Sequence, residues 1–77
     1  MVAVYTTPSC PHCRSAKQFL RQHHVSFREV DVAADAAGAR EMMRKSGQMG
    51  VPVIDVGGTI IVGFDRIRLL RALGLRA

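Results

Sequence analysis

The residues best suited to chemistry in this 77-residue chain are its two cysteines, Cys10 and Cys13, which are separated by Pro11 and His12. Two thiols at this spacing can close a small disulfide loop and open it again, whereas a structural disulfide joins distant segments. The pair follows a short apolar run, 2–5, and precedes a helical pattern. The spacing therefore predicts a redox site at a strand-to-helix turn.

The order of the two thiols along the chain predicts which one attacks. Proline is favoured as the first residue of a helix, so Pro11 makes Cys10 the N-cap, with its side chain facing free backbone N–H groups. Those donors and the positive end of the helix favour a thiolate. We expect Cys10 to be the attacking sulfur. We expect Cys13, one turn deeper, to resolve the mixed disulfide that forms on Cys10.

His12 lies between the two cysteines and has two interpretations. An imidazolium or N–H donor near Cys10 would stabilise the thiolate and make the dithiol couple more oxidising. The alternative is a solvated imidazole with no effect on the redox chemistry. The sequence leaves both open.

Hydrophobic periodicity predicts the elements of the first half of the chain. The apolar run over 2–5 predicts a buried strand, and apolar residues at helical spacing predict a helix from residue 11 to about residue 23. Alternating apolar side chains predict a second strand over 25–32, with an irregularity near 28–29.

The second half continues the alternation and ends in a helix. Asp35 is placed to cap a helix that reaches Ser46, and two apolar runs, 53–56 and 59–62, flank a Gly-Gly pair that is typical of a hairpin. Asp65 is placed to cap the last helix. The residues expected to face inward on that helix are Ile67, Leu69, Leu70 and Leu73.

The predicted order is βαβαββα, in a single domain over 1–77. This order favours an α/β fold with a four-stranded mixed sheet flanked by helices. A chain of 77 residues leaves no room for a large substrate cavity, so function must come from a small surface site. No apolar run approaches the ~18 residues of a membrane span, and no secretory signal precedes the first strand, so the expected location is the cytoplasm.

The chain carries eleven Lys and Arg residues against six Asp and Glu, a formal charge of +5. Anionic partners are favoured kinetically by such a charge, although a solvated helix face is the simplest explanation. Four of the arginines are Arg66, Arg68, Arg71 and Arg76. Only four aromatic residues and no recognition motif are present, which argues against nucleic-acid binding.

Three segments in order, 5–13, 50–53 and 63–65, resemble the glutaredoxin family. They read Tyr-Thr-Thr-Pro-Ser-Cys-Pro-His-Cys, Gly-Val-Pro-Val and Gly-Phe-Asp, and together the match spans essentially the whole chain. The resemblance is strongest to small glutaredoxin-like redoxins, some of which supply electrons to ribonucleotide reductase. It implies a thioredoxin-like fold and thiol-disulfide exchange through the CPHC motif.

The resemblance also implies roles for the two later segments. Pro52 would follow a cis peptide bond beside the cysteines, and the backbone of Val51 would pair with a bound peptide or glutathione. A trans proline that merely opens a strand is the alternative. Gly63, Phe64 and Asp65 would hold the γ-glutamyl end of glutathione; alternatively, Asp65 is an N-cap and Phe64 is part of the core.

Two positions depart from the glutathione-using pattern. Thr7 stands in a glutathione-contacting position where such members commonly have lysine, and Arg66 stands where a second acidic residue often follows. These departures make thioredoxin reductase the alternative electron source. The expected protein is a monomeric dithiol oxidoreductase that acts on a disulfide-containing protein, with no tightly bound cofactor and with glutathione as a candidate co-substrate.

A metal or iron–sulfur scaffold is the competing function. His23 and His24 lie about 15 Å along a helix from Cys13, so one chain cannot gather these groups around one metal ion, and no metal ligand is assigned. Two chains could share a cluster through Cys10 with glutathione, as some glutaredoxins do. The methionines at 42, 43 and 49 are interpreted as packing residues, with one of them as an alternative flank of the substrate groove.

Overall fold

The computed structural model describes residues 1–75, and Arg76 lies outside them. Its elements follow the predicted order: β1 (Val2–Thr6), α1 (Pro11–Gln22), β2 (Arg28–Asp31), α2 (Ala36–Ser46), β3 (Val53–Val56), β4 (Thr59–Val62) and α3 (Arg66–Leu73). None of the helices within 1–75 is long and apolar enough to cross a membrane.

The four strands form one mixed sheet in the order β2-β1-β3-β4. Strand β1 runs parallel to β2 and antiparallel to β3, and β3 pairs antiparallel with β4. Gly57 and Gly58 both have positive φ angles in the hairpin between β3 and β4, a conformation that glycine adopts without steric cost. The predicted α/β fold with a four-stranded mixed sheet is confirmed.

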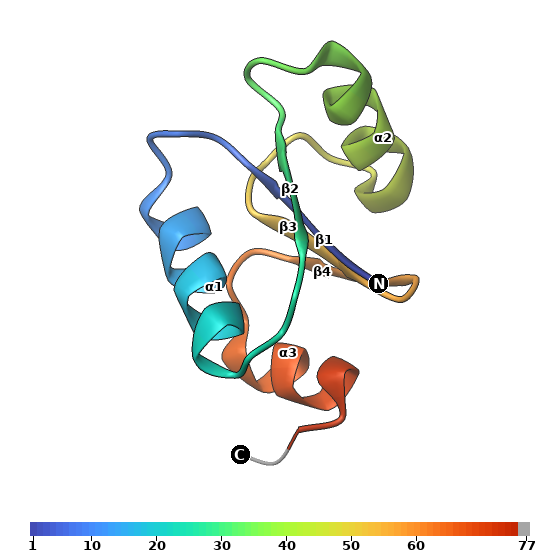
Figure 1. Ribbon diagram of the computed structural model, residues 1–77. Helices are drawn as coiled ribbons and strands as arrows, with labels where there is room; N and C mark the ends of the chain where they lie inside the picture. Colours follow the sequence, from blue (N-terminus) through green and yellow to red (C-terminus); the bar gives the residue numbers. More distant parts are fainter. Residues whose placement is uncertain (76–77) are drawn as a thin grey trace.

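Helices cover both faces of the sheet, with α1 and α3 on one face and α2 on the other (Figure 1). Successive side chains of a strand point to opposite faces, so Val2 and Val4 pack with α1 and α3 while Ala3 and Tyr5 pack with α2. Burial on both faces explains why β1 is apolar without interruption. The carboxyl end of β1 leads into the cysteine turn.

Strand β2 is shorter than predicted, because it begins at Arg28 and not at Val25. The backbone N–H of Val25 donates to the carbonyl of Leu20 at 2.9 Å, so this residue closes the end of α1 and is not part of the sheet. His24 has a φ of 57°, which turns the chain back toward the sheet. The expected irregularity at 28–29 is also absent: residues 28 and 29 pair in regular register with β1.

The last helix differs from its prediction at one residue. Leu69 and Leu70 are buried and Leu73 is partly buried, but Ile67 is 60% exposed. At 3.6 residues per turn, Ile67 lies about a third of a turn from the centre of the inward-facing arc. The helix is anchored by Asp65, whose carboxylate accepts from the backbone N–H of Arg68 at 3.1 Å.

Candidate active site

The start of α1 brings the two cysteine side chains together. Cys10 is the N-cap in an extended conformation, Pro11 opens the helix, and the backbone N–H of Cys13 donates to Cys10 Sγ at 3.2 Å. The predicted capping geometry is therefore confirmed. Cys10 is half-buried, whereas Cys13 is only 1% exposed. One sulfur is open to an incoming disulfide and the other lies behind it.

Burial raises the pKa of the Cys13 thiol to about 11, and its hydrogen bond with Cys10 acts in the same direction. A backbone hydrogen bond with Thr7 and the charge of Lys17 partly oppose that rise in pKa. Cys13 is therefore a neutral thiol near neutral pH, and it has to lose its proton during the step in which it attacks.

Val51 faces the reactive end of the helix. The Cys10 thiol lies 3.9 Å from the backbone carbonyl of Val51, and the Val51–Pro52 peptide bond is cis, as the resemblance implied. Pro52 is buried. Within residues 1–75, the backbone N–H of Val51 has no hydrogen-bond partner. The backbone beside Cys10 is thus free to pair with an extended peptide.

The segment 63–65 is tied to this region through its backbone, because the N–H of Gly63 donates to the carbonyl of Pro52 at 2.8 Å. Phe64 packs edge-on against Phe19 of α1, with ring centroids 5.9 Å apart. Asp65 caps α3 and remains partly exposed. The structural roles considered for Phe64 and Asp65 are therefore both present, and neither excludes ligand contact.

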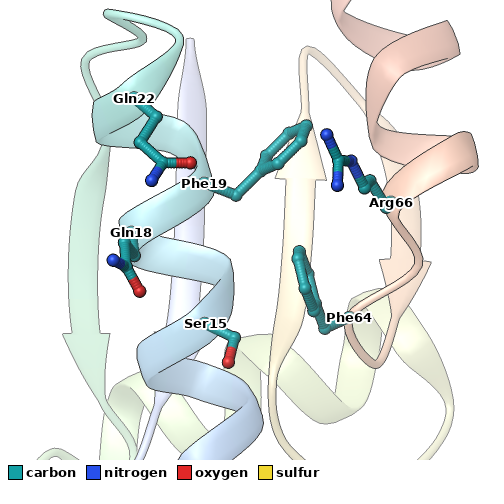
Figure 2. Close-up of a pocket in the computed structure, with 6 residues that line it drawn as sticks. All are labelled: Ser15, Gln18, Phe19, Gln22, Phe64 and Arg66. Atoms are coloured by element: carbon teal, nitrogen blue, oxygen red, sulfur yellow. The ribbon is translucent and has the colours of Figure 1, made fainter. Parts of the chain in front are cut away.

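The two departures from the glutathione-using pattern, Thr7 and Arg66, lie in different surroundings, and only Arg66 carries a charge. The Arg66 guanidinium lies 5.8 Å from the centre of the Phe19 ring, on the side of the groove between α1 and α3 (Figure 2). That groove measures about 210 Å³ and does not include the cysteines; its lining residues are Ser15, Gln18, Phe19, Gln22, Phe64 and Arg66. Thr7 is partly buried, and its carbonyl accepts from the Cys10 N–H at 3.4 Å.

The three histidines are spread along α1 and its end. His12 is exposed and forms no hydrogen bond with Cys10 within the described chain, so its tuning role stays a prediction. His23 packs against Phe19, with ring centroids 4.5 Å apart. Among residues 1–75, no cluster of three or more His, Cys, Asp or Glu side chains is placed to hold a metal ion.

Lys17 and Glu29 belong to the surroundings of Cys13, although no motif in the sequence marks them. Their charged groups lie 2.7 Å apart, and the buried Thr6 hydroxyl donates to the same carboxylate oxygen at 3.1 Å. Lys17 lies four residues after Cys13, which places both side chains on one face of α1. That spacing was the available signal for Lys17, whereas the contact with Glu29 depends on the parallel pairing of β1 and β2.

The sheet order and the dithiol at the start of α1 define a thioredoxin-like fold with a redox-type site. The crystal structure of the thioredoxin-like protein BC3987 matches 94% of this chain and 99% of its own, with a TM-score of 0.89 and 30% identity. The glutaredoxin-like protein NrdH-redoxin from Escherichia coli matches over 91% of each chain, with a TM-score of 0.80 and 24% identity, which shows the same fold.

The sequence comparisons give the family. The glutaredoxin family model matches residues 2–61. An uncharacterized glutaredoxin-like 8.6 kDa protein of Clostridium pasteurianum is 42% identical over 90% of this chain and 92% of its own. Glutaredoxin 3 of Escherichia coli K12 is 38% identical over 95% of this chain and 88% of its own. The chain belongs to the glutaredoxin family and is a thiol-disulfide oxidoreductase.

Proposed function

We propose that the protein reduces disulfides in protein substrates, and mixed disulfides on them, with Cys10 as nucleophile and Cys13 as resolving thiol. The observation that carries the proposal is the difference in exposure between the two sulfurs at one helix end. Cys10 is accessible beside the free N–H of Val51, whereas Cys13 is 1% exposed one turn further on. A substrate can therefore reach the first thiol while the second waits behind it.

The reaction proceeds in two exchanges. The Cys10 thiolate attacks one sulfur of the substrate disulfide, a new S–S bond forms, and the other substrate sulfur leaves as a thiolate that takes up a proton. The Cys13 thiol then gives up its proton and attacks Cys10 Sγ, which releases the second substrate thiol. The substrate gains two electrons, and the protein is left with a Cys10–Cys13 disulfide.

Backbone pairing at Val51 orients the substrate for the first exchange. An extended substrate segment can accept a hydrogen bond from the Val51 N–H, which holds its disulfide beside Cys10. We include Pro11, His12 and Pro52 in the same site, because Pro11 starts the helix, His12 flanks the thiol and Pro52 fixes the backbone next to Val51. Gly63, Phe64 and Asp65 border it through the Gly63–Pro52 hydrogen bond.

The oxidised protein is recycled by a flavoprotein thioredoxin reductase or by glutathione. The reductase is favoured, since Thr7 supplies no cation for a carboxylate and Arg66 replaces an acidic residue while its own charge stacks on Phe19. The glutaredoxin-like NrdH-redoxin of Escherichia coli, which shares this fold, has a thioredoxin-like activity profile. We further propose a monomer without a tightly bound cofactor, working in the reducing cytoplasm, with ribonucleotide reductase among its candidate substrates.

The test is an NADPH-coupled disulfide-reduction assay with two electron sources in parallel, thioredoxin reductase alone and glutathione with glutathione reductase. Turnover with the first and little with the second is the expected result. Turnover with glutathione alone would show that Thr7 and Arg66 do not prevent glutathione use. Inactivity in both, together with a cluster absorbance that Cys10→Ser removes, would replace this proposal by the dimeric cluster scaffold.

A further inference from the structure

A second surface feature lies on the α2 side of the sheet. A groove of about 310 Å³ runs between α2 and the segment that follows it. We call it the methionine groove; its lining residues are Ala39, Arg40, Met43, Arg44 and Met49. Met43 is 42% exposed and Met49 is 54% exposed, so both thioether side chains are open to solvent. Exposed methionines are adaptable contact residues, because the side chain is flexible and polarisable.

The groove is preformed by the way α2 ends. Met42 is fully buried against the sheet, which leaves Met43 on the flank of the helix. Gly47 stops α2 in a left-handed conformation, and the Gln48 side chain holds the segment that follows. That side chain accepts from the Gly50 N–H at 2.6 Å and donates to the Gly50 carbonyl at 3.0 Å. These two hydrogen bonds connect the residues on either side of Met49 and constrain the backbone at this position.

The rim of the groove carries positive charge. Arg40 and Arg44 lie one turn apart on α2, and within the described part of the chain neither forms an ion pair with a carboxylate. The neighbouring cation Lys45 is different, since its ammonium lies 2.7 Å from the Asp55 carboxylate. An apolar floor between two unneutralised guanidinium groups matches a segment in which an apolar side chain stands beside carboxylates.

The lining of the groove does not include the cysteines, but the groove is close to the candidate active site along the chain. Met49 precedes Val51 by two residues, a span of at most about 7 Å in extended chain. The carbonyl of Val51 lies 3.9 Å from the Cys10 thiol. A substrate segment paired with Val51 therefore reaches the methionine groove within a few residues of its disulfide.

We propose that the methionine groove docks a substrate protein segment that carries an apolar side chain and carboxylates a few residues from the disulfide. Met43 and Met49 contact the apolar side chain, and Arg40 and Arg44 pair with the carboxylates. The inference rests on the proposed disulfide reduction and adds to it the class of substrate. Contacts of this kind, made away from the reacting sulfur atoms, determine which substrates are preferred, because they change the affinity and the rate of encounter.

The experiment uses pre-reduced protein and two peptides of equal length. Each peptide contains a leucine and one cysteine held in a mixed disulfide with thionitrobenzoate; several glutamates flank the leucine in one, and lysines in the other. Attack by Cys10 joins its Sγ to the peptide sulfur, breaks the peptide–thionitrobenzoate bond and releases the coloured thiolate. Cys13 then loses its proton, attacks Cys10 Sγ and releases the peptide thiol. No reductase is needed for this single turnover.

The first-step rate is measured for both peptides and normalised to the mixed disulfide of thionitrobenzoate with mercaptoethanol. We expect the acidic peptide to react at least about tenfold faster than the basic one at low salt. The double variant Arg40→Glu, Arg44→Glu should remove or reverse that preference. Its control is Arg68→Glu, Arg71→Glu on α3, which changes net charge equally on the opposite face and should retain most of the preference. Met49→Ser removes a contact with the leucine that both peptides carry. It should therefore slow the reaction of the acidic peptide and leave the ratio of the acidic to the basic rate at high salt little changed.

Each contrary outcome has a distinct meaning. Equal rates for the two peptides in the wild type would overturn the docking surface and leave disulfide reduction standing. An equal loss of preference in both double variants would assign the effect to net charge and also overturn it. Failure of wild type on every disulfide, the small one included, would refute the proposed function and the docking surface with it. If the single-turnover preference does not depend on Arg40 and Arg44, but the rate of the thioredoxin-reductase-coupled assay does, substrate docking is overturned and the groove is assigned to the reductase.

Discussion

The backbone N–H of Cys13 donates to Cys10 Sγ across 3.2 Å, so a single turn of helix α1 stabilises one sulfur with the main chain of the residue that carries the other. The same turn separates their exposures, with Cys10 half-buried and Cys13 at 1%. Cys10 is accessible and accepts a backbone hydrogen bond, whereas Cys13 is a buried, neutral thiol behind it. This arrangement suits attack by one thiol after the other, and not two equivalent thiols.

Replacing each cysteine by serine is expected to give different products. Cys10→Ser should abolish disulfide reduction, because the buried Cys13 cannot reach a substrate. Cys13→Ser should complete the first exchange and stop, since no second thiol resolves the mixed disulfide. Mass spectrometry of the protein after reaction with a disulfide peptide measures the trapped adduct. An adduct on Cys13 in the Cys10→Ser variant, at a rate matching the adduct in the other variant, would reverse the assigned roles.

The resolving step should accelerate with pH well above neutrality. Because burial raises the pKa of Cys13 to about 11, its thiolate fraction rises about tenfold for each pH unit below that value. Stopped-flow release of the peptide thiol, measured separately from the first exchange, follows this step. A resolving rate that levels off near neutral pH would show that Cys13 loses its proton more easily than its burial indicates.

Lys17 should assist the same step through its charge, which lowers the pKa of Cys13. Lys17→Met should raise that pKa further and slow resolution by a few fold near neutral pH, with the first exchange less affected. Glu29→Gln is the matched control, since it removes the carboxylate that lies 2.7 Å from the ammonium and should shift the pH profile the opposite way. If the pH profile of the resolving step shifts in the same direction in both variants, the effect comes from the stability of the fold and not from the charge of Lys17.

The polar contacts under α2 should make the fold sensitive to acid. The Tyr5 hydroxyl donates to Glu41 and accepts from Lys45 at 2.8 Å. Its hydrogen bond, followed by that of Arg28, lowers the pKa of Glu41 to about 2. Since the folded-state pKa lies below the ordinary 4.5, this stabilisation is present above that pH and is lost as the pH falls toward 2.

Urea denaturation as a function of pH measures the effect of these contacts. Tyr5→Phe should lower the free energy of unfolding by about 1–2 kcal/mol at neutral pH, because Glu41 and Lys45 each lose one hydrogen bond. Glu41→Gln should flatten the acid limb of the profile. A wild-type unfolding free energy that does not change between the ordinary carboxyl pKa and about pH 2 would contradict the assignment.

Most of the fold was predictable because local signals agreed with the tertiary arrangement. Pro11 and Asp65 mark helix starts, the Gly57-Gly58 pair marks the hairpin, and the uninterrupted apolar run of β1 reflects burial on both faces. The start of β2 was not predictable from alternation alone. Val25 and Phe27 are apolar because they pack, partly buried, against the core cluster to which α1 and α3 contribute, although β2 begins only at Arg28.

The candidate site was predictable only where its residues are close in sequence. Cys10 and Cys13 share one helical turn, so their geometry followed from capping preferences. Lys17 lies on α1 and Glu29 lies on β2, so their contact depends on the pairing of β2 with β1 and on the packing of α1 over the sheet. The methionine groove depends on where the α2–β3 segment folds back. The position of the Arg66 side chain over Phe19 likewise depends on the packing of α3 against α1.

Restoring the two residues that glutathione-using members commonly carry should increase turnover with glutathione. In the double variant Thr7→Lys, Arg66→Asp, a cation is added shortly before the cap of α1 and a carboxylate replaces the guanidinium that stacks on Phe19. An aspartate in the first turn of α3 is also compatible with the helix dipole. We expect the glutathione-coupled rate to rise about tenfold, equivalent to about 1.4 kcal/mol, with the thioredoxin-reductase-coupled rate much less affected.

The coupled NADPH assay with both electron sources measures these two rates, and the double variant Thr7→Ser, Arg66→Lys is the conservative control. If the double variant gains no more than that control, the choice of reductant is set by residues other than these two.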